Sequence, residues 1–280
     1  MSAAGGSHAA ANVEFGADRS TTPRRRQGCT IVTVTATMEN AREEGLRLLA
    51  EGVRRRVDVR LIGGVAVAVR CPSTSQPPLS REYKDLDFVA RSQSSRLVEE
   101  LLVESGYTPA KRFNAINGHR RLLFHDEERG RQIDIIFDRF AMCHTIDFRD
   151  RMGIDQHTLP LADLLLTKLQ IVEINRKDLI DIVALLVDHQ ISDDSVHGID
   201  GSYISSLTAS DWGLWRTLQL NREKVRDFVN DLTWPRAEEA LDQITRLYSR
   251  IDSAPKNTKW KMRARIGDRV RWYELPEEVG

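Results

Sequence analysis

The chain has 280 residues, and its 41 lysines and arginines are balanced by 41 aspartates and glutamates. A net charge of zero excludes a protein that coats nucleic acid through a global positive field, and a hydrophobic content of 41% excludes a wholly disordered chain. No run of about 18 uncharged apolar residues occurs, so the sequence predicts no membrane-spanning helix.

Residues 1–37 are predicted to form a disordered tail, because they are rich in alanine, glycine, serine and threonine. The apolar stretch that follows the arginines at 24–26 is too short and too rich in threonine for an export signal. The three cysteines, Cys29, Cys71 and Cys143, lie far apart and lack the spacing of a zinc site. Such a sparse set is typical of a reducing compartment, so we expect a cytoplasmic protein.

Residues 38–145 are predicted to form a mixed α/β domain. Helices are expected at 38–53, with Thr37 as the N-cap, and at 65–69 and 95–105. Strands are expected at 57–62, 85–90, 121–124 and 132–137. The stretch 71–79 contains three prolines and is predicted to be a loop.

After about residue 145 the pattern changes to long helices, and no strand is predicted there. These helices are expected at 161–173, 177–189, 209–229 and 236–250. We therefore predict an α+β fold, in which a small mixed-sheet domain at 38–145 precedes an all-helical domain at 146–255. A basic C-terminal segment, residues 256–280, follows the helical domain.

Two carboxylates are predicted to lie side by side on the strand at 85–90. Because side chains alternate along a strand, Asp85 and Asp87 point to the same face, about 7 Å apart along the backbone. Two like charges repel each other here unless a cation joins them. Mg²⁺ is the natural partner, since it takes oxygen ligands and often bridges to substrate phosphates.

A third carboxylate and a pair of glycines extend this pattern. Asp134 lies among apolar residues of the strand at 132–137. If the two strands are neighbours, it completes a cluster that can hold two metal ions about 4 Å apart for phosphoryl transfer. Gly63 and Gly64 separate a predicted strand from a predicted helix, where a phosphate can approach the backbone. Each feature alone fits an ordinary turn or surface acid, but their ordered combination is more specific.

The sequence resembles the nucleotidyltransferase superfamily with the DNA polymerase β-type fold over about residues 40–190. Within it the chain is most similar to the AbiEii-type nucleotidyltransferases, the toxins of type IV toxin–antitoxin systems. The stretches that carry the resemblance are LIGGVAVAVR at 61–70, REYKDLDF at 81–88, QIDIIF at 132–137, and the helical stretches at 161–170 and 176–186. Tyr83 departs from the pattern, because the family often has threonine there.

The resemblance implies roles for these residues. Gly63 and Gly64 would cradle a nucleoside triphosphate (NTP), with Arg81 and Lys84 near its phosphates. Asp85 and Asp87 would bind Mg²⁺, and Asp134 would be a third metal ligand or the base that activates the acceptor hydroxyl. The reaction would transfer a nucleoside monophosphate to a tRNA, a protein hydroxyl or a small molecule, with release of pyrophosphate. An antitoxin protein would be a partner.

Lys168 lies on the apolar face of the helix predicted at 161–173, where a lysine must find a partner. Two explanations remain open and are compatible. Lys168 can form an ion pair with Asp178, or it can contact the triphosphate, as the resemblance implies. Asp181 lies on the more polar side of its predicted helix, and we expect it on a solvated face.

Residues 256–271 contain seven lysines and arginines but one acid, Asp268. Trp260 and Trp272 lie among or beside these cations. Such a segment either folds against acidic helices or binds RNA through phosphate contacts and base stacking.

Two alternatives to an active transferase follow from the same residues. The chain can be a non-catalytic module of the same fold that binds a nucleotide or a partner protein. It can also be a glycosyltransferase that holds a nucleotide-sugar diphosphate through an Asp-x-Asp motif, although Asp134 and the early glycine pair argue against this.

Overall fold

The structure is a computed structural model that describes residues 36–275. Most of the predicted tail, Cys29 and the last five residues of the basic segment therefore lie outside the described residues. Cys71 and Cys143 are both buried and neither forms a disulfide.

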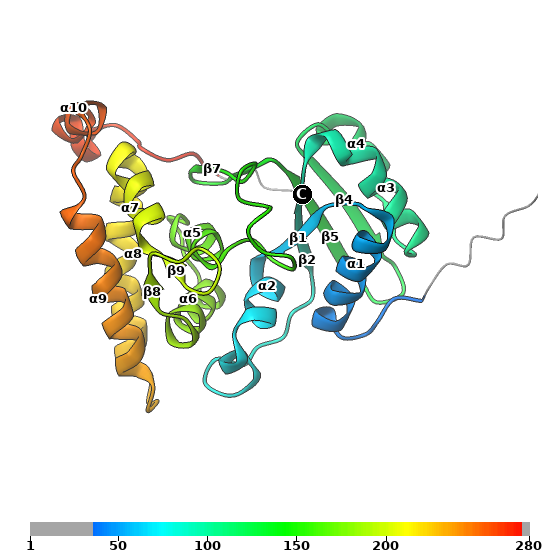
Figure 1. The fold of residues 1–280 in the computed structure, drawn as a ribbon, viewed down its shortest axis with the longest axis horizontal. Coiled ribbons are helices and arrows are strands. Elements are labelled where there is room, and N and C mark those ends of the chain that lie inside the picture. The colour runs from blue at the N-terminus through cyan, green and yellow to red at the C-terminus, as the bar shows by residue number, and fades with distance from the viewer. Residues whose placement is uncertain (1–35, 276–280) are drawn as a thin grey trace, which may run out of the picture. The chain divides into compact units, whose positions relative to one another are not determined.

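A five-stranded mixed sheet forms in the first part of the described chain, with the strand order β1-β2-β5-β4-β3 (Figure 1). Its strands are β1 (Val59–Ile62), β2 (Leu86–Ala90), β3 (Thr108–Pro109), β4 (Arg121–Asp126) and β5 (Arg131–Phe137). The pair β2–β5 is parallel, and the other pairs are antiparallel. The four predicted strands are confirmed, whereas β3 is too short to have a sequence signal.

The helices of this part flank the sheet, and α1, α3 and α4 contact β1, β3 and β4 (Figure 1). They are α1 (Ala41–Arg55), α2 (Gly63–Arg70), α3 (Ser95–Glu104) and α4 (Lys111–Asn117). The N-cap of α1 is Asn40 and not Thr37, so that prediction was wrong. The Asn40 side chain accepts hydrogen bonds from the first-turn amides of α1, which the earlier Thr37 does not cap.

The second part of the described chain consists mainly of helices. They are α5 (Leu161–Leu169), α6 (Arg176–Asp188), α7 (Gly201–Ser210), α8 (Trp212–Asn230), α9 (Ala237–Ser253) and α10 (Thr258–Ile266). The helix predicted at 209–229 is divided at Asp211, which lies between the end of α7 and the start of α8. The Asp211 side chain accepts a hydrogen bond from the Leu214 amide and so caps the N-terminus of α8.

Short strands also occur where none was predicted, one of them just before residue 145 and the others from there on. A hairpin joins β6 (Arg139–Ala141) to β7 (Thr145–Asp147), and β8 (Ile191–Ser192) pairs with β9 (Ile199–Asp200). Strands of two or three residues carry too few side chains for an alternation pattern. The fold is nevertheless α+β, a mixed sheet followed by a helical region.

The helix α2 links the two parts, since it packs on β1 and β2 and also contacts α5 and α6. Its apolar residues 65–68 are all buried in a core that continues from the sheet into the helical region. The start of α2 therefore lies where sheet residues and helical residues can meet. Within the described residues, no helix is both long and apolar enough to cross a membrane.

Candidate functional site

Asp87 and Asp134 face each other at the centre of the sheet. They are register partners on the parallel strands β2 and β5, so their side chains lie on the same face. Burial raises the pKa of Asp87 to about 6, and the negative charges of Asp134 and Asp85 add to this effect. Within the described residues, the Asp87 carboxylate accepts no hydrogen bond and joins no ion pair.

Asp134 has a different environment, because Arg121 of β4 forms a bidentate ion pair with it. The guanidinium Nε donates to one carboxylate oxygen, and Nη2 lies 2.7 Å from the other. The Gln132 side-chain amide also donates to Asp134, over 3.1 Å. Sequence reasoning missed Arg121, and its only signal was a cation beside the apolar run Leu122–Phe124 on a strand.

The strand β2 begins at Leu86, so Asp85 lies one residue before the strand and the prediction that the strand starts at Asp85 was wrong. The side chain of Asp85 accepts a hydrogen bond from the backbone N–H of Gln132, over 3.3 Å. Asp85 is exposed, yet it lies close enough to raise the pKa of Asp87. We call Asp85, Asp87 and Asp134 the acidic cluster.

The acidic cluster lies against the turn that joins β1 to α2. Gly63 has a φ of +68°, and a Cβ atom there would lie 2.2 Å from Oδ2 of Asp87. A Cβ atom on Gly64 would lie 2.2 Å from Nη2 of Arg81. Both positions therefore require glycine for the observed packing.

The amide groups at the start of α2 are candidates for binding an anion. No side chain caps this end of the helix, and the first turn contains no acid. A phosphate at such an end is stabilised by the free amides and by the helix dipole. The predicted phosphate-binding turn thus has a suitable backbone next to the acidic cluster.

Arg81 packs on this turn, but its guanidinium is held by Asp181 of α6. Its Nη2 lies 2.9 and 2.8 Å from the two carboxylate oxygens of Asp181, and it stacks over the Tyr83 ring at 4.1 Å. Lys84 is exposed and forms no hydrogen bond or ion pair with the described residues. Tyr83, at the position where the family often has threonine, therefore supports Arg81.

The prediction that Asp181 lies on a solvated face was wrong, since its side chain is fully buried. The helix α6 is covered on all sides, because every residue from 180 to 187 is buried. Asp181 therefore needs counter-ions, and Arg81 and Lys168 supply them.

Lys168 joins the same group, and the predicted Lys168–Asp178 ion pair is confirmed. Its ammonium nitrogen lies 2.9 Å from Oδ1 of Asp178 and 3.0 Å from Oδ2 of Asp181. Burial alone would lower the pKa of Lys168, but the charges of Asp181 and Asp178 outweigh it and raise the pKa. We call Arg81, Lys168, Asp178 and Asp181 the buried ion network.

The buried ion network also acts on the acidic cluster. The positive charge of Lys168 favours the ionised form of Asp87 and opposes the rise of its pKa. Whether Lys168 also contacts a triphosphate remains a prediction. The two groups of charges thus meet at the Gly63–Gly64 turn, from opposite parts of the chain.

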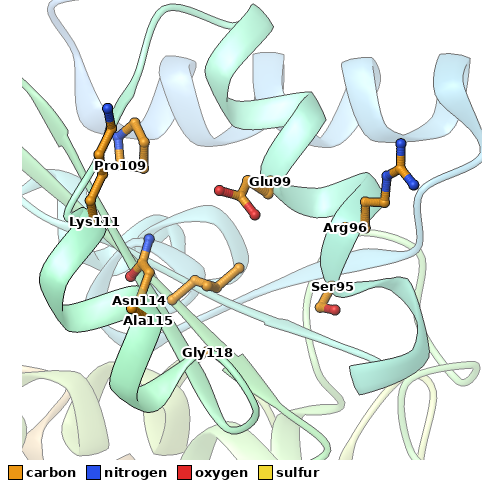
Figure 2. Close-up of a pocket in the computed structure, with 9 residues that line it drawn as sticks. Ser95, Arg96, Glu99, Pro109, Lys111, Asn114, Ala115 and Gly118 are labelled. Carbon is orange, nitrogen blue, oxygen red and sulfur yellow. The ribbon is translucent and has the colours of Figure 1, made fainter.

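A separate cavity of about 390 Å³ lies between α3 and α4, and none of the predicted site residues lines it (Figure 2). Figure 2 shows Arg96 and Glu99 on α3 and Lys111 and Asn114 on α4. The Asn114 side-chain NH2 group donates a hydrogen bond to the Leu123 carbonyl, and its side-chain oxygen accepts one from the Leu123 backbone N–H. The chemistry-bearing residues therefore do not gather in this cavity.

The basic C-terminal segment folds against the helical region, and its tryptophan rings pack on other rings. The Trp260 ring lies 5.1 Å from that of Trp215, and the Trp272 ring lies 6.0 Å from that of Trp212. These rings are partly buried, which opposes their predicted use in base stacking. Exposed cations without an acidic partner among the described residues remain on this segment, namely Lys259, Lys261, Arg265, Arg269 and Arg271.

A group of three or more histidine, cysteine, aspartate or glutamate side chains placed to hold a metal ion is not found within residues 36–275. A metal ion at the acidic cluster would therefore take further ligands from substrate or water. Mg²⁺ commonly binds in this way, through one or two carboxylates, phosphate oxygens and several waters. The unpartnered carboxylate of Asp87 beside Asp85 fits such a site.

Comparison with known protein families finds no family that matches the chain. No curated protein matches it either. Among solved structures, the chain is similar to the lincosamide antibiotic adenylyltransferase LnuA in its lincomycin-bound crystal structure. The likeness has 18% sequence identity and a TM-score of 0.37, and it covers 53% of this chain and 96% of that chain. A likeness at this level assigns no family.

Proposed function

We propose that the protein is a nucleotidyltransferase that moves a nucleoside monophosphate from an NTP to a hydroxyl acceptor. The observation that carries this proposal is the packing of Asp87 against Gly63, with Asp134 as its register partner. This arrangement places the carboxylate of Asp87, which has no ion-pair partner among the described residues, beside a helix start that suits a phosphate. A purely structural turn has no need of a carboxylate whose pKa is raised to about 6.

The chemistry is a substitution at the α-phosphorus of the NTP. The acceptor oxygen forms a bond to this phosphorus, the bond to the β-phosphate oxygen breaks, and pyrophosphate leaves. The hydroxyl proton passes to a carboxylate of the acidic cluster or to water. A divalent cation held by Asp85 and Asp87 supplies charge neutralisation for the phosphates when it is bound.

The side chains around the turn have complementary tasks in this reaction. The free amides at the start of α2 bind phosphate oxygens. Arg81 is fixed by Asp181 and lines the turn beside Gly64, so it orients the backbone there. The positive charge of Lys168 acts on Asp87 and favours its ionised form, which is the form that binds a cation.

RNA is the acceptor class that the surface charges favour. The five exposed cations on and after α10 form no ion pair with described residues, so they are available for phosphate groups. The role of a type IV toxin, with an antitoxin partner, is a further part of the proposal and rests on the resemblance of the motifs alone.

The test is incubation of the purified protein with each α-labelled NTP, Mg²⁺ and total RNA or cell lysate, followed by separation of RNA, protein and small molecules. We expect label in one fraction, together with release of pyrophosphate. Asp87→Asn should abolish the transfer while circular dichroism shows an intact fold. Full transfer by this variant would overturn the proposal.

A non-catalytic binding module is the second candidate function. It is favoured by one observation, which is that Arg81 and Asp134 are both engaged by other side chains of the chain. Calorimetry with each NTP and Mg²⁺ separates the two functions, because binding without any release of pyrophosphate in the transfer assay would indicate the module.

A further inference from the structure

Arg121 holds Asp134 in a bidentate ion pair next to Asp87, where a two-metal enzyme would place a second cation. We propose that the Arg121 guanidinium takes the place of that second cation, so that the site holds a single divalent ion on Asp85 and Asp87. This inference rests on the proposed function, which requires a metal at the acidic cluster.

The balance of charge around the acidic cluster favours a single divalent ion. The buried ion network contains two cations and two anions and is neutral by itself. The acidic cluster contributes three negative charges, and Arg121 removes one of them through Asp134. Among the described residues around the cluster, two negative charges remain, which is the charge that one divalent cation neutralises.

The carboxylate oxygens of the acidic cluster differ in whether they are available to a metal ion. Both carboxylate oxygens of Asp134 accept hydrogen bonds from Arg121, and one of them also accepts from Gln132. A metal ion bridging Asp87 and Asp134 would have to displace these donors from the Asp134 oxygens. Asp87 and Asp85 keep oxygen atoms that no cation of the described residues occupies.

A guanidinium can supply the positive charge that a second metal ion would otherwise supply. A guanidinium is always protonated, and its planar donors suit both carboxylate and phosphate oxygens. Fixed arginine charge is a known means of stabilising the transition state of phosphoryl transfer. Arg121 thus gives the site one permanent positive charge, which does not depend on the concentration of metal ions.

The experiment counts bound Mn²⁺ on the full chain by electron paramagnetic resonance of the free ion, during a titration without nucleotide. For the natural sequence we expect one Mn²⁺ per chain. Arg121→Gln removes the guanidinium and frees Asp134, so we expect two. Arg121→Lys is the matched control, because it keeps a positive charge at the same place and should bind one.

The outcomes separate this inference from the proposed function. Two Mn²⁺ on the natural sequence, or none, would overturn the inference, whereas the proposed function is decided separately by the transfer assay with labelled NTPs. One Mn²⁺ on the natural sequence and still one on folded Arg121→Gln would show that Arg121 does not exclude the second ion. A count other than one on the natural sequence overturns the inference without any variant, and a count of one is assigned to Arg121 only if the folded Arg121→Gln chain binds two.

Discussion

Two groups of charged side chains meet at the Gly63–Gly64 turn, and they differ in how their charges are balanced. In the buried ion network, Asp181 lies between Arg81 and Lys168, and every charge has a partner. In the acidic cluster, Asp87 lacks a partner among the described residues. Buried charges are costly unless they are paired. Removing one partner from the network therefore destabilises the fold, whereas the unpaired charge of Asp87 has a cost in free energy that a bound cation can relieve.

This difference separates structural charges from those available for function. A paired, buried group contributes to stability whether or not a ligand is present. An unpaired group in the same neighbourhood lowers stability until a ligand arrives. Substitutions in the network and at Asp87 should therefore change stability in opposite directions.

The largest effect is expected at Asp181. Asp181→Ala leaves the charges of Arg81 and Lys168 without their shared carboxylate, and we expect the free energy of unfolding to fall by about 3–5 kcal/mol. Urea unfolding at neutral pH measures the change. Asp242→Ala is the control, because Asp242 forms an exposed ion pair with Arg246 and should lose less than about 1 kcal/mol. A small loss at both positions would contradict a stabilising role for the network.

A smaller loss is expected for Gly63→Ala. The positive φ alone costs an alanine about 1–2 kcal/mol, and the added Cβ atom would also collide with Asp87. We expect a total of about 2–3 kcal/mol, measured by urea unfolding. Gly130→Ala is the matched control, since Gly130 has a φ of +61° but no atom near the added Cβ. Equal losses of unfolding free energy at both glycines would mean that the added Cβ atom at position 63 does not collide with Asp87.

Much of this arrangement could be predicted from the sequence, because it depends on local patterns. In strands such as β5, apolar residues alternate with polar ones or follow one another without a break, and this pattern predicts a strand. Gly63 and Gly64 indicate the turn before α2. The parallel pairing of β2 and β5 then brings Asp87 and Asp134 together. The helix α4 was missed because it buries no residue and so has no apolar face to detect.

The partners of the charged groups could not be predicted in the same way. Asp181 was placed on a solvated face because its helix has charged residues near it in sequence, but packing covers that face completely. Arg121 contacts Asp134 from the neighbouring strand β4, and the register in which β4 pairs with β5 is fixed by tertiary structure. Lys168 was the exception, since a lysine on an apolar stripe requires a partner within reach.

A stabilising effect is expected for Asp87→Asn in metal-free buffer. The pKa of Asp87 is raised to about 6 in the folded protein, so ionisation opposes folding. The cost is absent below the unfolded pKa, grows between about pH 4 and 6, and is complete above the folded value. At pH 7.5 we expect the variant to gain about 1–2 kcal/mol, since partial exposure screens the full shift.

The measurement is the unfolding midpoint of Asp87→Asn and of the natural sequence from pH 4 to pH 8. The difference in stability between Asp87→Asn and the natural sequence should shrink towards zero as the pH approaches 4. Added Mg²⁺ should raise the midpoint of the natural sequence and not that of the variant. A variant less stable than the natural sequence at pH 7.5 would show that Asp87 has a stabilising partner.

The smallest effect on stability is expected on α10, where the charges belong neither to the network nor to the cluster. Lys261 and Arg265 are exposed and make no ion pair with described residues, so replacing both with glutamine should change the free energy of unfolding by less than about 0.5 kcal/mol. The same change should weaken RNA binding. If both cations contact phosphates, the slope of log affinity against log salt falls by about 1–2.

A matched pair of cations elsewhere distinguishes a docking surface from general attraction. Arg42 of α1 and Lys177 of α6 are also exposed, and replacing both with glutamine removes the same net charge. If RNA binds at α10, the two double variants differ in their salt slopes, because only the α10 pair contacts phosphate. Equal slopes would mean that RNA responds to net charge alone, and the exposed cations of α10 would then give no reason to prefer RNA over another acceptor.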